Sequence, residues 1–145
     1  MPETFKCAIV TPTESVLDEE VNQVEFPQWD GQRGILAGAA PFVAKMGAGR
    51  LRIDYPEGGT RVFLLAGGFA EMSDNTLMLV ADEVIPREEL ELSAAEARLS
   101  EAIDAVTAEG STDLLERERL ELARNRANAE VQLAKERDLQ GAKVG

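Results

Sequence analysis

The sequence of 145 residues contains no histidine and only one cysteine. Histidine is the commonest general base near neutral pH and the commonest metal ligand, so the usual Ser-His and Cys-His catalytic pairs are excluded. A single cysteine can form neither an internal disulfide nor a thiolate metal site. Because Cys7 alternates with Phe5 and Ile9, we interpret it as a strand residue of the core, the alternative being a reactive thiol. We expect no catalytic residue and no metal site.

Long apolar runs and basic clusters are also lacking. No apolar stretch approaches the roughly 18 to 20 residues that span a bilayer, and the N-terminus resembles neither a secretory signal nor a transit peptide. A net charge of −12 disfavours binding to nucleic acid and to an anionic membrane surface. We therefore expect no nucleic-acid partner, and membrane association only through another protein.

The residues up to Pro86 consist of short extended segments separated by turn signals. Period-2 alternation or continuous apolar runs predict strands over residues 5–11, 21–26, 51–55, 62–66, 68–72 and 76–81. Turns are expected at 56–59 and 73–75. The pattern predicts that residues 1–86 form a β-sandwich of about ten short strands, a barrel being the alternative closure.

The remaining residues, 87–145, are rich in helix-forming residues and contain no proline. Apolar side chains recur at helical spacing in two stripes, at 92, 95, 99, 102, 103 and 106 and at 120, 123, 127, 131 and 134. Gly110 favours a helix end, and Ser111 or Thr112 can cap the next helix. We predict an antiparallel helical hairpin with helices of roughly 20 to 25 residues.

The stripes of this hairpin contain mostly alanine. Alanine buries little area, at about 25 cal/mol per Å² of apolar surface, so the hairpin is expected to be marginal by itself. It should therefore dock elsewhere or move. The alternative is a solvated appendage with no moving role.

Several residues stand out as candidates for contacts. Trp29 lies in a polar loop, where it either contacts a partner or folds back onto its own domain. Gly67 and Gly68 lie inside an apolar strand, where they mark a bulge or a binding contact. Four arginines of the second helix, Arg117, Arg119, Arg124 and Arg126, either form helical ion pairs or meet an acidic partner.

Other features carry less chemistry. The carboxylate pairs at 19–20, 82–83 and 88–89 have no pocket signal and are interpreted as solvated charge. The glycines at 31–34 and 47–49 lack phosphate-loop spacing and are interpreted as turn residues.

Three segments together resemble the epsilon subunit family of F-type ATP synthases. Residues 31–41, GQRGILAGAAP, resemble the family's Gly-Glu-x-Gly-Ile-Leu-Pro-Gly-His-Ala-Pro stretch. Residues 65–71, LAGGFAE, resemble its Leu-x-Gly-Gly-x-x-Glu strand, and 80–82, VAD, its Leu-Ala-Asp continuation. A helical hairpin follows in both cases, so the resemblance covers nearly the whole chain.

The resemblance implies a non-catalytic subunit of the central stalk in a bacterial enzyme, located peripherally on the cytoplasmic face of the inner membrane. The sandwich would link the gamma subunit to the c-ring and so couple ion flow to rotation. Candidates for this interface are Trp29, Asp30, Gly31, Gln32, Gly34, Ala39, Pro41, Gly67 and Gly68. The hairpin would reach the alpha and beta subunits in an extended form that blocks ATP hydrolysis, with Arg117, Arg119, Arg124 and Arg126 as contact candidates.

The chain departs from the family pattern at several positions. Gln32 replaces the motif's glutamate, and Ala37 and Ala39 replace its proline and histidine. Some bacterial members bind ATP through Ile/Leu-Asp-x-x-Arg-Ala, where this chain has Glu91 for the aspartate and Ala94 for the arginine. The loss of the cation predicts weak or no ATP binding and hence no cofactor.

Two other functions compete with this one. A free-standing β-sandwich could bind a small molecule or sugar and use the helices as a dimerisation arm, with Trp29 as a stacking platform. A hydrolase or isomerase using paired carboxylates is the weaker alternative, because histidine is absent.

Overall fold

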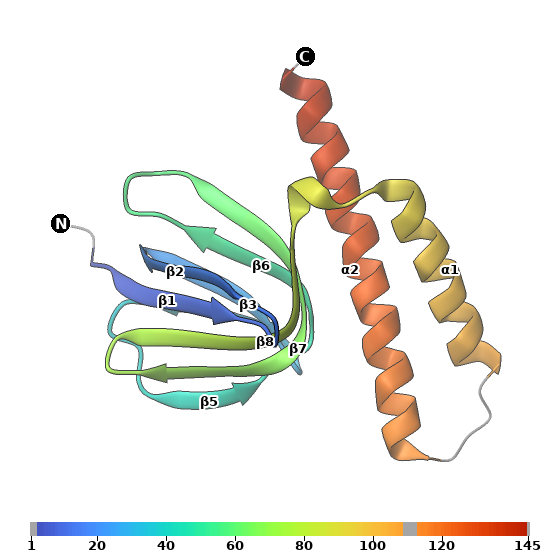
Figure 1. Ribbon diagram of the computed structural model, residues 1–145, viewed down its shortest axis with the longest axis horizontal. Coiled ribbons are helices and arrows are strands. Elements are labelled where there is room, and N and C mark those ends of the chain that lie inside the picture. Colours follow the sequence, from blue (N-terminus) through green and yellow to red (C-terminus); the bar gives the residue numbers. More distant parts are fainter. Residues whose placement is uncertain (1–2, 109–112, 145) are drawn as a thin grey trace.

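The computed structural model describes residues 3–108 and 113–144, and there the chain forms an all-β part followed by a helical hairpin (Figure 1). The strands are β1 (Phe5–Val10), β2 (Ser15–Val21), β3 (Gln23–Gln28), β4 (Gly31–Leu36), β5 (Phe42–Lys45), β6 (Ala48–Asp54), β7 (Thr60–Ser73) and β8 (Thr76–Pro86). The helical elements are η1 (Arg87–Glu89), α1 (Leu92–Ala108) and α2 (Leu114–Val144). The fold class predicted from the sequence is therefore confirmed.

The strands form one sheet that folds over on itself around the core. Their order is β2-β1-β8-β7-β6-β3-β4, with β5 paired to β7, and only the β1–β8 pair is parallel. The inner face carries buried aromatic and aliphatic side chains, among them Phe5, Phe26, Phe63 and Leu77. Cys7 belongs to this core, and burial, followed by the charges of Glu19 and Asp18, raises the pKa of its thiol to about 12. The thiol is therefore protonated at neutral pH.

A bend at Gly67 and Gly68 allows β7 to pair with β6 along its first half and with β5 along its second. Both glycines have positive φ, +74° and +110°. The Gly67 N–H donates to the Gly47 carbonyl (3.0 Å), and the Met46 N–H donates to the Gly68 carbonyl (2.8 Å). A Cβ on Gly68 would lie 2.0 Å from the Val80 carbonyl oxygen. The glycine pair thus allows a close approach of backbones within the domain.

The strand count differs from the sequence prediction, since the described residues form eight strands. The segments 62–66 and 68–72 are one bent strand, β7. The sequence did not indicate β2, β4 or β5 separately, and glycines interpreted as turn residues lie in β4 and β6. Pro27 lies inside β3, beyond the residues that pair with β6, where its missing N–H removes no bond to that neighbour.

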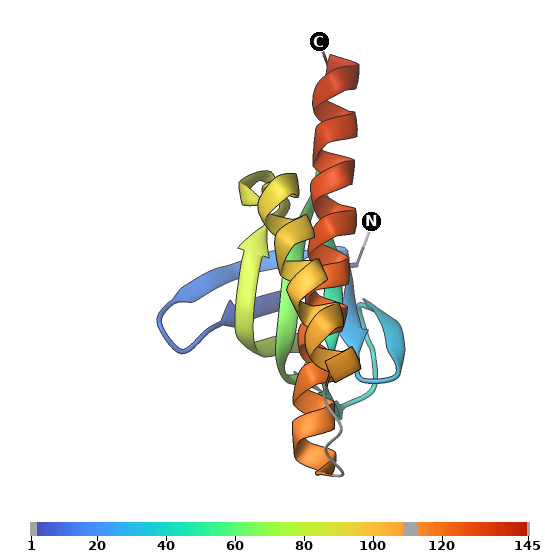
Figure 2. The same cartoon turned by 90° about the vertical axis from the view of Figure 1, so that its right-hand side faces the viewer.

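The two helices are antiparallel but unequal, with 17 residues in α1 and 31 in α2, whereas the sequence predicted similar lengths. Helix α2 lies between the sheet and α1 and extends beyond α1 at both ends (Figures 1 and 2). The predicted stripes are buried at Ala95, Ala127, Val131 and Ala134, but Ile103 is exposed. The predicted caps at 110–112 lie outside the described residues. No helix in the described ranges is long and apolar enough to cross a membrane.

Candidate partner-binding surfaces

The hairpin docks on the sheet through a small apolar cluster. Its members are Val62 and Leu64 of β7, Leu90 after η1, and Leu133 and Ala134 of α2, all buried. The contact lies in the C-terminal half of α2, which faces β6 and β7 (Figure 1). A cluster of this size contributes only a few side-chain burials, each worth about 1.5 to 3 kcal/mol at most. Polar contacts around it therefore matter for docking.

Four charged residues, which we call the clasp, connect α1, α2 and β8. Arg126 of α2 binds both carboxylate oxygens of Glu83 on β8, at 2.6 and 2.8 Å. Arg126 also donates to Glu130 one turn later, at 2.8 Å. Arg98 of α1 binds the two oxygens of Glu130 at 3.0 and 2.5 Å. The Glu130 side chain is 1% exposed, so it depends on both arginines for compensation of its charge.

The clasp changes the pKa values of its members. Hydrogen bonding to Arg126 is the largest influence on Glu83 and holds its pKa below the usual 4.5. Burial raises the pKa of Glu130, but the hydrogen bonds and charges of Arg98 and Arg126 outweigh it, so that this pKa is also lowered. Hydrogen bonds to Glu130 and Glu83 raise the pKa values of Arg98 and Arg126, respectively.

Acid is therefore expected to weaken docking. Both carboxyls have lowered pKa values in the docked state, so their contribution is fully present above the usual value of 4.5 and is lost as the pH falls through the lowered values. The fluorescence of Trp29, the only tryptophan, reports the change because residues of α2 line a cavity beside it. We expect its emission to shift to the red as the pH falls below the usual carboxyl value of 4.5. A Glu130→Gln chain that shows the same acid transition as the unmodified chain would contradict this assignment.

A second group of polar contacts lies at the other side of the apolar cluster. Glu136 of α2 contacts Arg50 of β6 and Arg87 of η1, the latter at 3.5 Å. Arg137 donates to the carbonyl of Leu90. These contacts fix the C-terminal half of α2 to both the sheet and the connecting segment.

The part of α2 that precedes Arg126 stands away from the sheet. A cavity of about 370 Å³ separates Leu115 and Leu122 of α2 from Trp29, Gly67 and Gly68. A neighbouring cavity of about 420 Å³ is lined by Trp29, Gly31 and Gln32 and by Glu121, Leu122 and Asn125. Five of the nine interface candidates thus lie at the end of the sandwich that faces α2.

The other interface candidates lie elsewhere. Asp30 is exposed next to Trp29 and accepts a hydrogen bond from the Gln28 amide (3.0 Å). Gly34 is exposed along β4, an edge of the sheet. Ala39 packs against the core, while Pro41 is exposed before β5. Ala39 and Pro41 lie near the β7–β8 turn, since Gly38 donates its N–H to the Asn75 side chain (2.9 Å).

Exposed apolar side chains form a patch on the outer face of β5, β7 and β8 and on the turn between β3 and β4. We call it the Phe69 patch; its members are Trp29, Val43, Phe69 and Val80. Phe69 is 58% exposed and is paired across the sheet with Lys45 on one side and Val80 on the other. The Lys45 ammonium lies 4.4 Å from the centre of the Trp29 ring. Trp29, at 47% exposure, therefore belongs to a surface rather than to the core.

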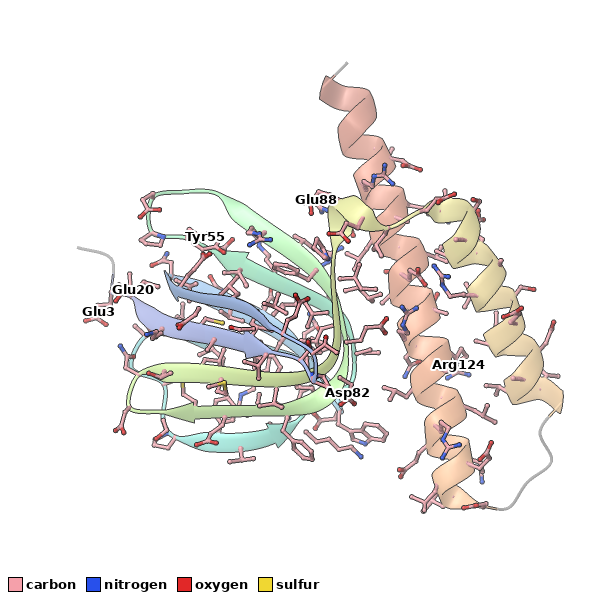
Figure 3. All side chains as sticks on the ribbon, viewed as in Figure 1. Glu3, Glu20, Tyr55, Asp82, Glu88 and Arg124 are labelled. Carbon is pink, nitrogen blue, oxygen red and sulfur yellow. The ribbon has the colours of Figure 1, made fainter. Side chains whose placement is uncertain are left out.

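The four candidate arginines of α2 do not share one surface in this structure. Arg117 and Arg119 are exposed, and Arg119 pairs with Glu116 at 3.8 Å. Arg124 is half-buried and projects from α2 on the side of α1 (Figure 3). Arg126 is enclosed in the clasp, its side chain 20% exposed.

The positions of the degenerate nucleotide motif lie at the start of α1. The Glu91 carbonyl accepts the Ala95 N–H (2.9 Å), and the Glu91 carboxylate accepts the Ser93 hydroxyl (3.2 Å). Ala94 is half-buried and offers no polar group. Among the described residues, no three of the types Cys, Asp and Glu gather to hold a metal ion.

Sequence reasoning missed three members of the clasp. The sequence indicates Glu83 only as solvated charge and does not single out Glu130 or Arg98 as contact candidates. The available signal was local: Arg126 and Glu130 are four residues apart on one helix face, the spacing of an ion pair. The partners from β8 and α1 are distant in sequence and follow only from the fold.

Comparison with known proteins agrees with this architecture. Residues 4–87 match the family model described as "ATP synthase, Delta/Epsilon chain, beta-sandwich domain". The ATP synthase epsilon chain of Synechococcus sp. (strain JA-2-3B'a(2-13)) is 32% identical over 142 residues, covering 98% of each chain. The epsilon chain of Propionigenium modestum, named sodium ion specific, is 36% identical over 63% of this chain and 66% of its own.

The fold is also similar to that of a chain in a solved structure. A chain in the Euglena gracilis mitochondrial ATP synthase structure, containing OSCP, F1 and the c-ring, has a TM-score of 0.74 and 25% identity. The match covers 89% of this chain and 80% of that one. Since the family model spans more than half of the sequence and a relative aligns over nearly all of it, this chain belongs to the family of ATP synthase delta/epsilon chains.

Proposed function

We propose that the chain is the epsilon subunit of a bacterial F-type ATP synthase, a non-catalytic part of the central stalk. The observation that carries the proposal is the alignment over 98% of a curated epsilon chain, sandwich and hairpin together. The subunit links gamma to the c-ring and so couples ion translocation to ATP synthesis. It reaches the cytoplasmic face of the inner membrane only as a peripheral part of the complex.

The gamma subunit is assigned to the Phe69 patch. Exposed apolar groups in one contiguous area on a monomer mark an interaction surface, and aromatic side chains dominate the energetics of such surfaces. Lys45 and Glu71 lie beside the patch and supply a polar rim. Of the sequence candidates, Pro41 directly precedes β5 and Gly68 lies within β7.

The c-ring is assigned to the β4 edge. This strand exposes Gln32, Gly34 and Leu36, with Leu36 among the large exposed apolar residues. Gln32 donates its amide to the Arg50 carbonyl (3.2 Å). With Gln32 in place of an acid, the edge presents no carboxylate at that position to the polar loops of the ring.

A charge placed in the Phe69 patch tests the gamma assignment. Phe69→Arg is expected to weaken the complex with gamma by at least about 30-fold, because a desolvated aromatic anchor is worth about 2 kcal/mol or more. Binding is measured with the tagged full chain and purified gamma subunit. Leu139→Arg, at a similarly exposed leucine near the end of α2, is the control and should bind gamma like the unmodified chain. Equal binding by the two variants would move gamma to another surface.

The hairpin is assigned an inhibitory role. In the docked position Arg117 and Arg119 are already exposed, whereas Arg126 is held by Glu83. An extended hairpin would present these cations, with Arg124, to acidic residues of the alpha and beta subunits. No nucleotide is proposed as a switch, because Glu91 and Ala94 lack the required chemistry.

A further inference from the structure

The clasp is arranged as a chain of alternating charges. From the sheet outward the order is Glu83, Arg126, Glu130 and Arg98, in which each inner member contacts two partners of opposite charge. The whole set is electrically neutral. Within the clasp, only the contact between Glu83 and Arg126 crosses from the hairpin to the sandwich, since Glu130 and Arg98 both belong to the hairpin.

We propose that Glu83 takes the place of an acidic residue of a partner protein. By binding Arg126, Glu83 holds the hairpin on the sheet. The Arg126 guanidinium becomes available to another protein only after this bidentate contact has broken. The identity of that protein rests on the proposed function, whereas the contact between Glu83 and Arg126 does not.

The geometry gives Glu83 this role for two reasons. A bidentate arginine–carboxylate pair is among the strongest and most directional of side-chain contacts, and Glu83 accepts from Nε and one Nη of Arg126. If Glu83 were neutral, Arg126 would rely on Glu130 alone, which Arg98 already binds with both oxygens. The half-buried cation would then be undercompensated in the docked state, whereas the undocked state would expose it to water.

The rest of the docking contact is limited enough for one ion pair to matter. The apolar cluster has five buried members, and Glu136 and Arg137 add contacts further along α2. Cavities separate the part of α2 that precedes Arg126 from the sheet. A change at Glu83 should therefore alter the docking equilibrium without unfolding the sandwich, whose core lies on the inner face of the sheet.

Hydrogen exchange of the isolated full chain tests the contact. Glu83→Gln keeps the size of the side chain and removes its charge. We expect amides of α2 between 126 and 136 to exchange about tenfold faster, with β1 unchanged. Asp82→Asn is the matched control: Asp82 is adjacent and exposed, and it forms no ion pair among the residues that the structure describes. Equal exchange in Glu83→Gln and Asp82→Asn would overturn the proposal.

A double-mutant cycle identifies the partner. Once Arg126→Gln is present, adding Glu83→Gln should produce little further acceleration, because the contact has already been lost. Full additivity of the two effects would show that Glu83 acts through something other than Arg126 and would also overturn the proposal.

The assembled enzyme tests the regulatory consequence separately. With Glu83→Gln in the complex, ATP hydrolysis should fall at least about threefold, because the hairpin leaves the sandwich more often and Arg126 is released. If exchange is faster in the isolated chain but hydrolysis is unchanged, the contact between Glu83 and Arg126 is supported. The proposal that Arg126 is released to a partner protein is then overturned. If the chain failed to assemble with gamma at all, the proposed function would be at fault instead.

Discussion

Gly68→Ala is expected to destabilise the sandwich by about 4 kcal/mol, a large part of the roughly 5 to 15 kcal/mol that stabilises a typical domain. The added Cβ would lie 2.0 Å from the Val80 carbonyl oxygen, at a residue whose φ is +110°. A rigid backbone atom cannot move aside as the end of a side chain can. The bend of β7 would have to open, and with it the pairing to β5 and β8.

The same substitution at Gly34 provides the control. A Cβ there would lie 3.8 Å from Glu25 Cγ and 3.9 Å from Gln23 Nε2, which are ordinary contacts. Gly34→Ala should change the stability by no more than about 1 kcal/mol. Urea unfolding followed by circular dichroism measures both variants, and similar midpoints for the two would contradict the structural role of the bend.

Removing the hairpin after Pro86 is expected to raise ATP hydrolysis by the assembled enzyme at least about fivefold, while the sandwich remains bound to gamma. The gamma surface proposed here, the Phe69 patch, lies on β-strands and a loop that the truncation leaves intact. The hairpin carries every arginine assigned to the alpha and beta subunits, so its loss removes the inhibitory contact completely. Unchanged hydrolysis by a complex that still contains the truncated chain would contradict the inhibitory role.

Truncation also uncovers apolar surface. Val62 and Leu64 of the sheet form one buried cluster with Leu90, Leu133 and Ala134, which the truncation removes. A second truncated chain carrying Leu64→Thr places a polar, β-branched residue on the strand, which suits a strand and reduces aggregation. The two truncated chains should give the same hydrolysis rate, which separates loss of the hairpin from loss of solubility.

The sequence predicted the sandwich wherever strands alternate clearly, as in β1 and β6. It missed β2, β4 and β5 because these are edge strands with few buried side chains; β2 contains Asp18, Glu19 and Glu20 on a largely solvated strand. It also divided β7 in two, because a glycine pair inside an apolar run does not reveal whether the chain turns back or only bends.

For the hairpin, the sequence predicted the helices but not all of their contact faces. One apolar stripe was predicted for α2, but this helix lies between α1 and the sheet and also buries Leu133 against β7. The apolar residues of α2 that face the sheet are interrupted by charged ones. Arg126 contacts Glu130, and Arg137 donates to the Leu90 carbonyl. A buried ion pair breaks the apolar periodicity that would have indicated the second contact face. Long-range partners such as Glu83 cannot be found from spacing.

We propose that this chain connects gamma to the c-ring in an ATP synthase. The most direct test is to purify the tagged full chain from detergent-solubilised membranes of its host and identify the accompanying chains by mass spectrometry. We predict recovery of gamma, alpha, beta and c subunits with the unmodified chain, and a marked loss of gamma with Phe69→Arg. Recovery of the unmodified chain without gamma or beta subunits would contradict this role.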